Sequence, residues 1–264
     1  MRIFDFHNDI LTEKADCAAE LIKYGGRNLK VITAVFRNKL VFSEACALAE
    51  KAKYCAFEDA GYERVDAAKL KTFNPRYVGL TWNGENSLGY GCNFNYGLKP
   101  KGINFIKQLS GVPIDTAHIS KHGFKDIIDN AEVVVDSHTA FSGVRRHKRN
   151  LEDWQIKLII EKKGIIGLCL VGYFLTENKT CLISDVINHI DYFANKFGIE
   201  NLAVGTDFYG TDYLPENLKD YKNFKILVEK LTEKGYNKED IDKIFYKNLF
   251  DFTEKHNGRH NGLQ

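Results

Sequence analysis

The chain has 264 residues, a length that fits one large domain or two small ones. Its 37 basic and 35 acidic side chains leave a formal charge of +2, which argues against an obligate nucleic-acid or membrane partner. Apolar residues make up 44% of the chain, which is enough for a sizeable core.

The six cysteines contain no Cys-x-x-Cys pair, which excludes a zinc ribbon or a thioredoxin-like motif. Cys55 and Cys169 lie inside apolar strand-like runs and are most simply buried thiols, so we expect a reducing compartment. No apolar run is long enough to span a bilayer. We see no signal peptide before the first apolar run, and the polar residues 255–264 do not resemble an anchor-attachment signal. We therefore expect a cytoplasmic protein without a membrane partner.

Short apolar runs alternate with longer amphipathic ones along the chain. Eight runs have the length and the β-branched content of strands: residues 3–7, 30–36, 54–58, 77–82, 112–118, 133–138, 165–171 and 202–207. Helical spacing of apolar residues is found between and after them: residues 44–52, 67–72, 103–109, 123–130, 153–162, 183–197, 224–234 and 238–252.

Eight strands that alternate with helices predict a (β/α)8 TIM barrel. The nearly continuous apolar character of strands such as 133–138 fits a parallel sheet that is covered on both faces. A doubly wound open sheet is the alternative. We find no linker and no internal repeat, so we predict a single domain over residues 1–254 and a polar tail over residues 255–264.

Ionisable residues stand at the carboxyl ends of most of these strands. Side chains at i and i+2 of a strand point the same way, so His7 and Asp9 can project together from the end of the first strand. In a parallel barrel all of these ends share one rim, where active sites of this architecture lie. A lone strand-end histidine is more simply a hydrogen-bonded one, but six candidates at one rim favour a metal site. The six are His7, Asp9, Glu58, His118, His138 and Asp207.

The residue types suggest a division of roles within this set. Two imidazoles make a nitrogen-rich half-site, an imidazole with a carboxylate makes a mixed one, and Glu58 stands between them in strand order with two oxygens that can bridge. Two divalent cations can share a water and lower its pKa towards neutrality. Asp207 is then placed to act as general base and acid. The ligand types accept zinc, manganese or cobalt.

The sequence also resembles the membrane (renal) dipeptidase family of binuclear zinc peptidases, which are amidohydrolase-like (β/α)8 barrels. The resemblance covers nearly the whole chain and is specific in the combination and order of its segments. These are Phe-His-Asn-Asp at 6–9, Phe-Glu-Asp at 57–59, Leu-Thr-Trp-Asn at 80–83, Asp-Thr-Ala-His-Ile-Ser at 115–120, Asp-Ser-His-Thr at 136–139, Lys-Arg-Asn-Leu at 148–151 and Gly-Thr-Asp-Phe at 205–208.

The resemblance implies a fold, a pair of zinc ions and a set of roles. His7 and Asp9 would bind one zinc, and His118 and His138 the other. Glu58 would bridge the two, Asp207 would be the acid and base, and Arg149 would bind the free carboxylate of a dipeptide. A guanidinium suits that last role because it pairs with a carboxylate through two hydrogen bonds. The alternative for the basic loop 145–149 is a solvated surface or, less favoured, a nucleic-acid patch.

Three departures from the family pattern concern the substrate more than the metals. Trp82 stands where renal-type members carry a histidine that is thought to contact the substrate carbonyl, and an indole N–H can only donate. The segment between Asp9 and Glu58 is short, and Tyr209 replaces a common acidic residue. We expect Trp82 to contact substrate, but in a different way.

The sequence thus predicts a dipeptidase that cleaves dipeptides with a free C-terminal carboxylate through a hydroxide shared by two zinc ions. A related barrel metallohydrolase that acts on another amide or a lactone is the alternative, and a non-catalytic metal-binding descendant is a third reading. The expected partner is a small dipeptide, and a homodimer is left open. His122 and His189 are predicted to be surface residues outside the site.

Overall fold

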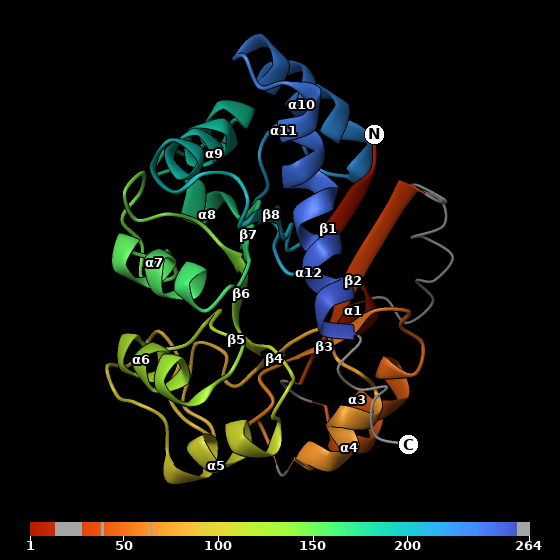
Figure 1. The fold of residues 1–264 in the computed structure, drawn as a ribbon, viewed down its shortest axis with the longest axis vertical. Coiled ribbons are helices and arrows are strands. Elements are labelled where there is room, and N and C mark those ends of the chain that lie inside the picture. The colour runs from red at the N-terminus through yellow and green to blue at the C-terminus, as the bar shows by residue number, and fades with distance from the viewer. Residues whose placement is uncertain (14–27, 38–39, 64, 258–264) are drawn as a thin grey trace.

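The computed structural model describes residues 1–13, 28–37, 40–63 and 65–257. Within these ranges eight parallel strands close into a barrel in chain order (Figure 1). The strands are β1 (Ile3–Asn8), β2 (Leu29–Phe36), β3 (Cys55–Glu58), β4 (Val78–Gly79), β5 (Ile114–Asp115), β6 (Val134–Thr139), β7 (Ile166–Leu168) and β8 (Leu202–Val204). Asp5 of β1 pairs with Val204 of β8, and this contact closes the sheet. The predicted (β/α)8 barrel is confirmed, and the open sheet is wrong.

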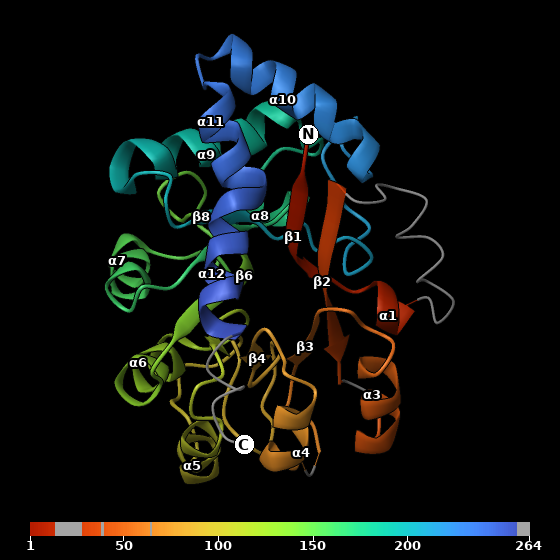
Figure 2. The same ribbon diagram turned by 45° about the vertical axis from the view of Figure 1, so that its right-hand side comes forward.

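Helices surround the barrel on its outer side, as Figures 1 and 2 show. The longer ones are α3 (Phe42–Ala49), α4 (Ala67–Thr72), α5 (Pro100–Gln108), α6 (Lys121–Asn130), α7 (Asp153–Glu161), α9 (Ile183–Phe197), α10 (Phe224–Glu233) and α12 (Asn248–Asn257). Shorter helical segments are α1 (Ile10–Glu13), α8 (Gly172–Leu175), η2 (Tyr221–Asn223), α11 (Lys238–Asp242) and the π-helical turn η3 (Lys243–Lys247). No helix in the described ranges is long and apolar enough to cross a bilayer.

Two apolar clusters form the core. The larger one lies between the strands and the surrounding helices. The smaller one fills the interior of the barrel at its amino-terminal end. In the smaller cluster Phe4, Ile32 and Val133 meet Leu249 and Phe252 of α12. Helix α12 therefore closes the amino-terminal mouth of the barrel (Figure 1), and the opposite rim is left for chemistry.

Several strands are shorter than the sequence predicts, because the chain turns sharply just after them. His118 and Asp207 have φ angles of 67° and 59°, in the left-handed region that non-glycine residues rarely adopt. β5 ends at Asp115 and β8 at Val204, three residues before these side chains in each case. The ionisable groups after β5 and β8 are thus carried by strained turns and not by the last residues of the strands.

The structure corrects one surface prediction. His189 is fully buried on the inner face of α9, one turn from Val186 and beside Ile190, so the prediction of a surface position is wrong. His122 is exposed near the start of α6, as predicted. Helix α12 continues to Asn257, so the first residues of the predicted tail are helical. Cys17 and the tail residues from 258 onward lie outside the described residues.

Candidate metal centre

The six predicted site residues lie together at the carboxyl-terminal rim of the barrel. Glu58 is central: its Oε1 lies 2.8 Å from His118 Nε2 and 3.8 Å from His138 Nε2, and its Oε2 lies 4.0 Å from His7 Nε2. On the other side His7 Nε2 lies 3.4 Å from Asp9 Oδ1 and 3.7 Å from Asp207 Oδ1. All six residues are buried, with 9% or less of each residue exposed.

The donor atoms of this set fit divalent cations. His7 Nε2, Asp9 Oδ1 and Glu58 Oε1 are buried and have no hydrogen-bond partner among the described residues. Buried polar atoms in native proteins nearly always have a hydrogen-bond partner. We therefore expect these three atoms to bind a cation. Ligand atoms converge in two overlapping groups, each within 4.8 Å: His7 with Glu58 and His138, and His7 with Asp9 and Asp207.

The hydrogen-bond partners of the Nδ1 atoms of His118 and His138 explain why the Nε2 atoms of these two rings face the centre. His118 Nδ1 lies 2.8 Å from Asn83 Oδ1, which can only accept, so the Nδ1 must carry the proton. Ser137 Oγ donates to Asp115 at 2.6 Å and lies 2.9 Å from His138 Nδ1, so it accepts from that ring.

The two Nε2 atoms of His118 and His138 therefore both carry lone pairs, yet they lie only 2.8 Å apart. Burial first, and nearby cations after it, hold the pKa of each ring well below its usual value, so both rings are neutral. Two lone pairs at this distance repel each other. A cation beside them turns this repulsion into coordination.

The carboxylate side of the centre is strongly negative. Burial acts to lower the pKa of His7, but the surrounding carboxylates, Asp9 foremost, raise it to about 10. Burial raises the pKa of Glu58 to about 7, and burial followed by the Asp9 charge raises that of Asp207 well above its ordinary value. A bound cation would replace the proton that these groups otherwise share.

Gly210, in the turn after β8, leaves room for the carboxylates of Asp9 and Asp207. A Cβ on Gly210 would lie 2.1 Å from Asp207 Oδ1 and 2.2 Å from Asp9 Oδ2. Any side chain at position 210 would push these carboxylates aside, which gives the turn after Asp207 a direct role in the shape of the centre.

The centre opens into a cavity of about 530 Å³ that has Asp9, Glu58, His118 and Asp207 in its lining. Much of the wall is aromatic, with Phe36, Trp82, Tyr173, Phe174 and Tyr209. Trp82 is 40% exposed, and the centroid of its ring lies 5.6 Å from that of the Phe36 ring and 6.0 Å from that of the His118 ring.

Arg149 lies close to the centre but is not among the residues that line this cavity. Its Nη2 donates to the carbonyl of His138 at 3.1 Å, and its guanidinium lies 5.4 Å from the ring of Phe174. Arg149 is buried, and within the part of the chain that the structure describes its Nε has no hydrogen-bond partner.

Three residues that orient the histidines were not identified as site residues from the sequence. They are Asn83, Ser137 and Tyr77, whose hydroxyl lies 2.7 Å from His7 Nδ1. Asn83 and Ser137 stand within the segments shared with the dipeptidases, beside Trp82 and His138. The sequence around Tyr77 gives no sign of a role at the site, because its pattern is that of an ordinary strand residue.

The closed parallel barrel with this rim of histidines and carboxylates defines a metallohydrolase of the TIM-barrel type. Residues 60–262 match the family model described as Membrane dipeptidase (Peptidase family M19). The chain therefore belongs to the membrane dipeptidase family, and it is an enzyme, a metal-dependent dipeptidase. The matched stretch contains His118, His138, Arg149 and Asp207, whereas His7, Asp9 and Glu58 precede it.

Individual relatives agree with this assignment. The chain is 29% identical over 188 residues to an uncharacterised protein in the pqqA 5′ region of Klebsiella pneumoniae, covering 66% of this chain and 69% of that protein. It is 23% identical over 159 residues to the dipeptidase tcpJ of Claviceps purpurea, covering 59% of this chain but 37% of the fungal protein.

Solved structures of the same fold include two peptidases. One is a metallopeptidase from Rhodobacter sphaeroides bound to a phosphinate mimic of the dipeptide L-Ala-D-Ala, with a TM-score of 0.81, 18% identity, and coverage of 97% of this chain and 99% of that one. The other is dipeptidase AC, a metallopeptidase of family M19, with a TM-score of 0.82, 20% identity, and coverage of 98% and 99%. At these identities the similarity is one of fold.

Proposed function

We propose that the enzyme binds two divalent cations, zinc in the native state, and hydrolyses dipeptides that carry a free C-terminal carboxylate. His7 and Asp9 would hold one cation and His118 and His138 the other, with Glu58 shared between them. The observation that carries this proposal is the pair of lone pairs on His118 and His138, which face each other at 2.8 Å next to the Glu58 carboxylate. Divalent cations held by these residues would lower the pKa of a bound water towards neutrality and so supply a nucleophile.

The protein residues would then position the dipeptide and move a proton. Asp207 lines the cavity, and its raised pKa suits a carboxyl group that takes up a proton and gives it to the leaving amine. Arg149 offers a guanidinium with an unpartnered Nε, which suits a carboxylate ligand. Trp82 would form an apolar wall beside the substrate carbonyl and could donate one hydrogen bond through its indole N–H.

We also propose a cytoplasmic location. The five cysteines among the described residues are all free thiols, which is what a reducing compartment favours.

The experiment is hydrolysis of a library of L,L and L,D dipeptides by the purified protein, as isolated, after chelation and after addition of zinc, manganese or cobalt. Cleavage that disappears on chelation, returns with about two equivalents of zinc and does not extend to C-terminally amidated peptides would support each part of the proposal. Cleavage that survives complete metal removal would contradict the two-metal site. Bound metal without cleavage of any dipeptide would direct the search to other amides or lactones.

A further inference from the structure

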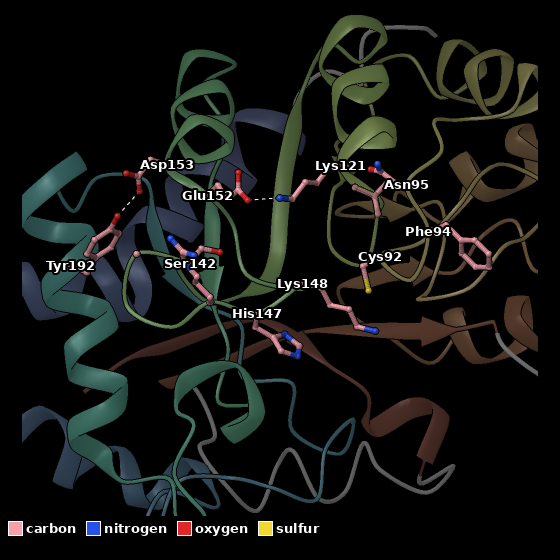
Figure 3. A pocket seen from close by; sticks show the side chains of 13 residues that line it. Cys92, Phe94, Asn95, Lys121, Ser142, His147, Lys148, Glu152, Asp153 and Tyr192 are labelled. Carbon is pink, nitrogen blue, oxygen red and sulfur yellow. Dashed lines mark hydrogen bonds and ion pairs between the residues drawn. The ribbon is translucent and has the colours of Figure 1, made fainter.

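The structure has a second cavity, of about 970 Å³, whose lining residues are drawn in Figure 3. It adjoins the metal cavity. The two share a wall, because residues of one contact or adjoin residues of the other in three places. Cys92 Sγ of the second cavity lies 3.0 Å from Asn83 Oδ1 of the first, and the ring of His147 stacks on that of Phe174 at 4.8 Å. Ile119 of the second cavity directly follows His118 of the first.

The basic loop after β6 contributes positive charge to the lining of the second cavity. Arg146 and Lys148, from the basic loop after β6, both line it. Neither has a carboxylate within 4 Å among the described residues, and Lys148 Nζ bonds to the neutral amide oxygen of Asn93. Figure 3 shows Lys148 on the same side of the cavity as Cys92. Burial, followed by the neighbouring arginines and Lys148, lowers the pKa of His147 to about 4, so this ring adds no charge of its own.

The acidic residues of the cavity are already paired. Glu152 accepts from Lys121, and Asp153 bonds to Tyr192 and to Lys196 at the far end (Figure 3). These pairs reduce the negative charge of the cavity, and Arg146 also interacts with the Glu152 carboxylate. Lys148, and Arg146 in part, are left to attract an anion.

The position of Arg149 connects this cationic space to the substrate. Its guanidinium lies 5.4 Å from the ring of Phe174, and its backbone N–H donates to His147 Nδ1 at 3.2 Å, so it stands at the shared wall. In a dipeptide the C-terminal α-carboxylate and the C-terminal side chain branch from one carbon atom. If Arg149 holds that carboxylate, as the proposed function states, the C-terminal side chain branches off beside Phe174 and His147, the residues of the shared wall that Arg149 contacts.

We propose that this cavity is a subsite for an acidic C-terminal side chain, and that the enzyme prefers dipeptides ending in glutamate or aspartate. Lys148 and Arg146 are the specificity-determining residues. This inference rests on the proposed function, since it needs the carboxylate to be bound at Arg149.

The test compares kcat/KM for three dipeptides that share an N-terminal alanine and end in Glu, Gln or Ala, each with both enantiomers of the second residue. Gln has the shape of Glu without its charge, so the Glu/Gln ratio isolates the effect of the charge. We expect the zinc-loaded enzyme to favour Glu over Gln by roughly tenfold at low ionic strength, and less at high salt. In the double variant Lys148→Met/Arg146→Met the ratio should fall to within about twofold of unity.

Two control variants separate this effect from a general change of charge or fold. Lys51→Met removes an exposed lysine that lines neither cavity and should keep both the turnover and the ratio. Lys148→Arg keeps the charge and should retain the preference for Glu. A Glu/Gln ratio near one in the wild type, or a ratio that survives the double variant, would overturn the subsite while cleavage of Ala-Ala left the dipeptidase proposal standing. Absence of cleavage for all three peptides, zinc present, would instead overturn the proposed function together with the subsite.

Discussion

His189 should make the protein sensitive to mild acid. The ring is fully buried between two rim segments: its Nδ1 accepts from the backbone N–H of Phe141 at 3.1 Å, and its Nε2 lies 3.1 Å from the carbonyl of Leu175. Both contacts need the neutral ring with its proton on Nε2. Burial lowers the pKa of His189 from 6.5 to about 4.

The sign of the effect follows from this lowered pKa. Between pH 6.5 and pH 4 the unfolded chain binds a proton at this ring and the native protein does not, so the free energy of unfolding decreases as the pH falls. A pH of 5 lies about 1.5 units below the pKa of the ring in the unfolded chain. Protonation of the unfolded chain at this ring therefore lowers the free energy of unfolding by about 2 kcal/mol relative to pH 7.

The measurement is urea unfolding of the metal-free protein at pH 7 and pH 5, for the wild type and for His189→Gln. Other titrating groups contribute to both proteins, so the difference between their pH dependences reports His189. We expect the wild type to lose about 2 kcal/mol more than the variant between the two pH values. His122→Gln is the matched control, since His122 is exposed on α6, and it should lose as much as the wild type. An identical pH dependence for wild type and His189→Gln would refute the reasoning.

Three further predictions concern the metal centre and its substrate. Arg149→Met should lower kcat/KM for dipeptides by about 100-fold but for their C-terminal amides by only a few-fold, because only the former present a carboxylate to the guanidinium; equal losses would exclude that role. Glu58→Gln keeps the shape of a side chain that lies within 4.0 Å of three imidazoles but removes its charge, so zinc binding measured by competition with a chelator should weaken by about 100-fold or more. Asn83→Ala removes the acceptor that fixes the His118 ring and should weaken zinc binding by about 10-fold to 100-fold, and an unchanged affinity would show that the ring is oriented by something else.

Much of the fold could be predicted because it depends on local patterns. Apolar runs of four to eight residues separated by amphipathic segments indicate strands and helices. Eight alternating strands and helices favoured a closed barrel over an open sheet, and the pairing of β1 with β8 confirms the closure. The lengths of the strands could not be predicted in this way. β5 ends at Asp115 although its apolar pattern continues, because the turn that bears His118 adopts a left-handed backbone that only the surrounding structure can hold.

Helix faces depend on neighbours that a sequence does not display. His189 looks like a polar residue of an amphipathic helix, yet it lies on the inner face of α9 because the carbonyl of Leu175 and the N–H of Phe141 satisfy its two nitrogens. A polar residue can be buried wherever such partners exist, and these two belong to segments 14 and 48 residues away in the chain.

The sequence indicated which side chains would meet: ionisable residues at or just after the carboxyl ends of parallel strands face one rim of a barrel. How these groups face one another depends on contacts that form only in the folded chain. The tautomers of His118 and His138 depend on Asn83 and Ser137, and the second cavity depends on a loop after β6 that packs beside Phe174. Hydrogen bonds and electrostatic interactions act over a few ångströms in space, so their strength and direction are set by distances that exist only after the chain has folded.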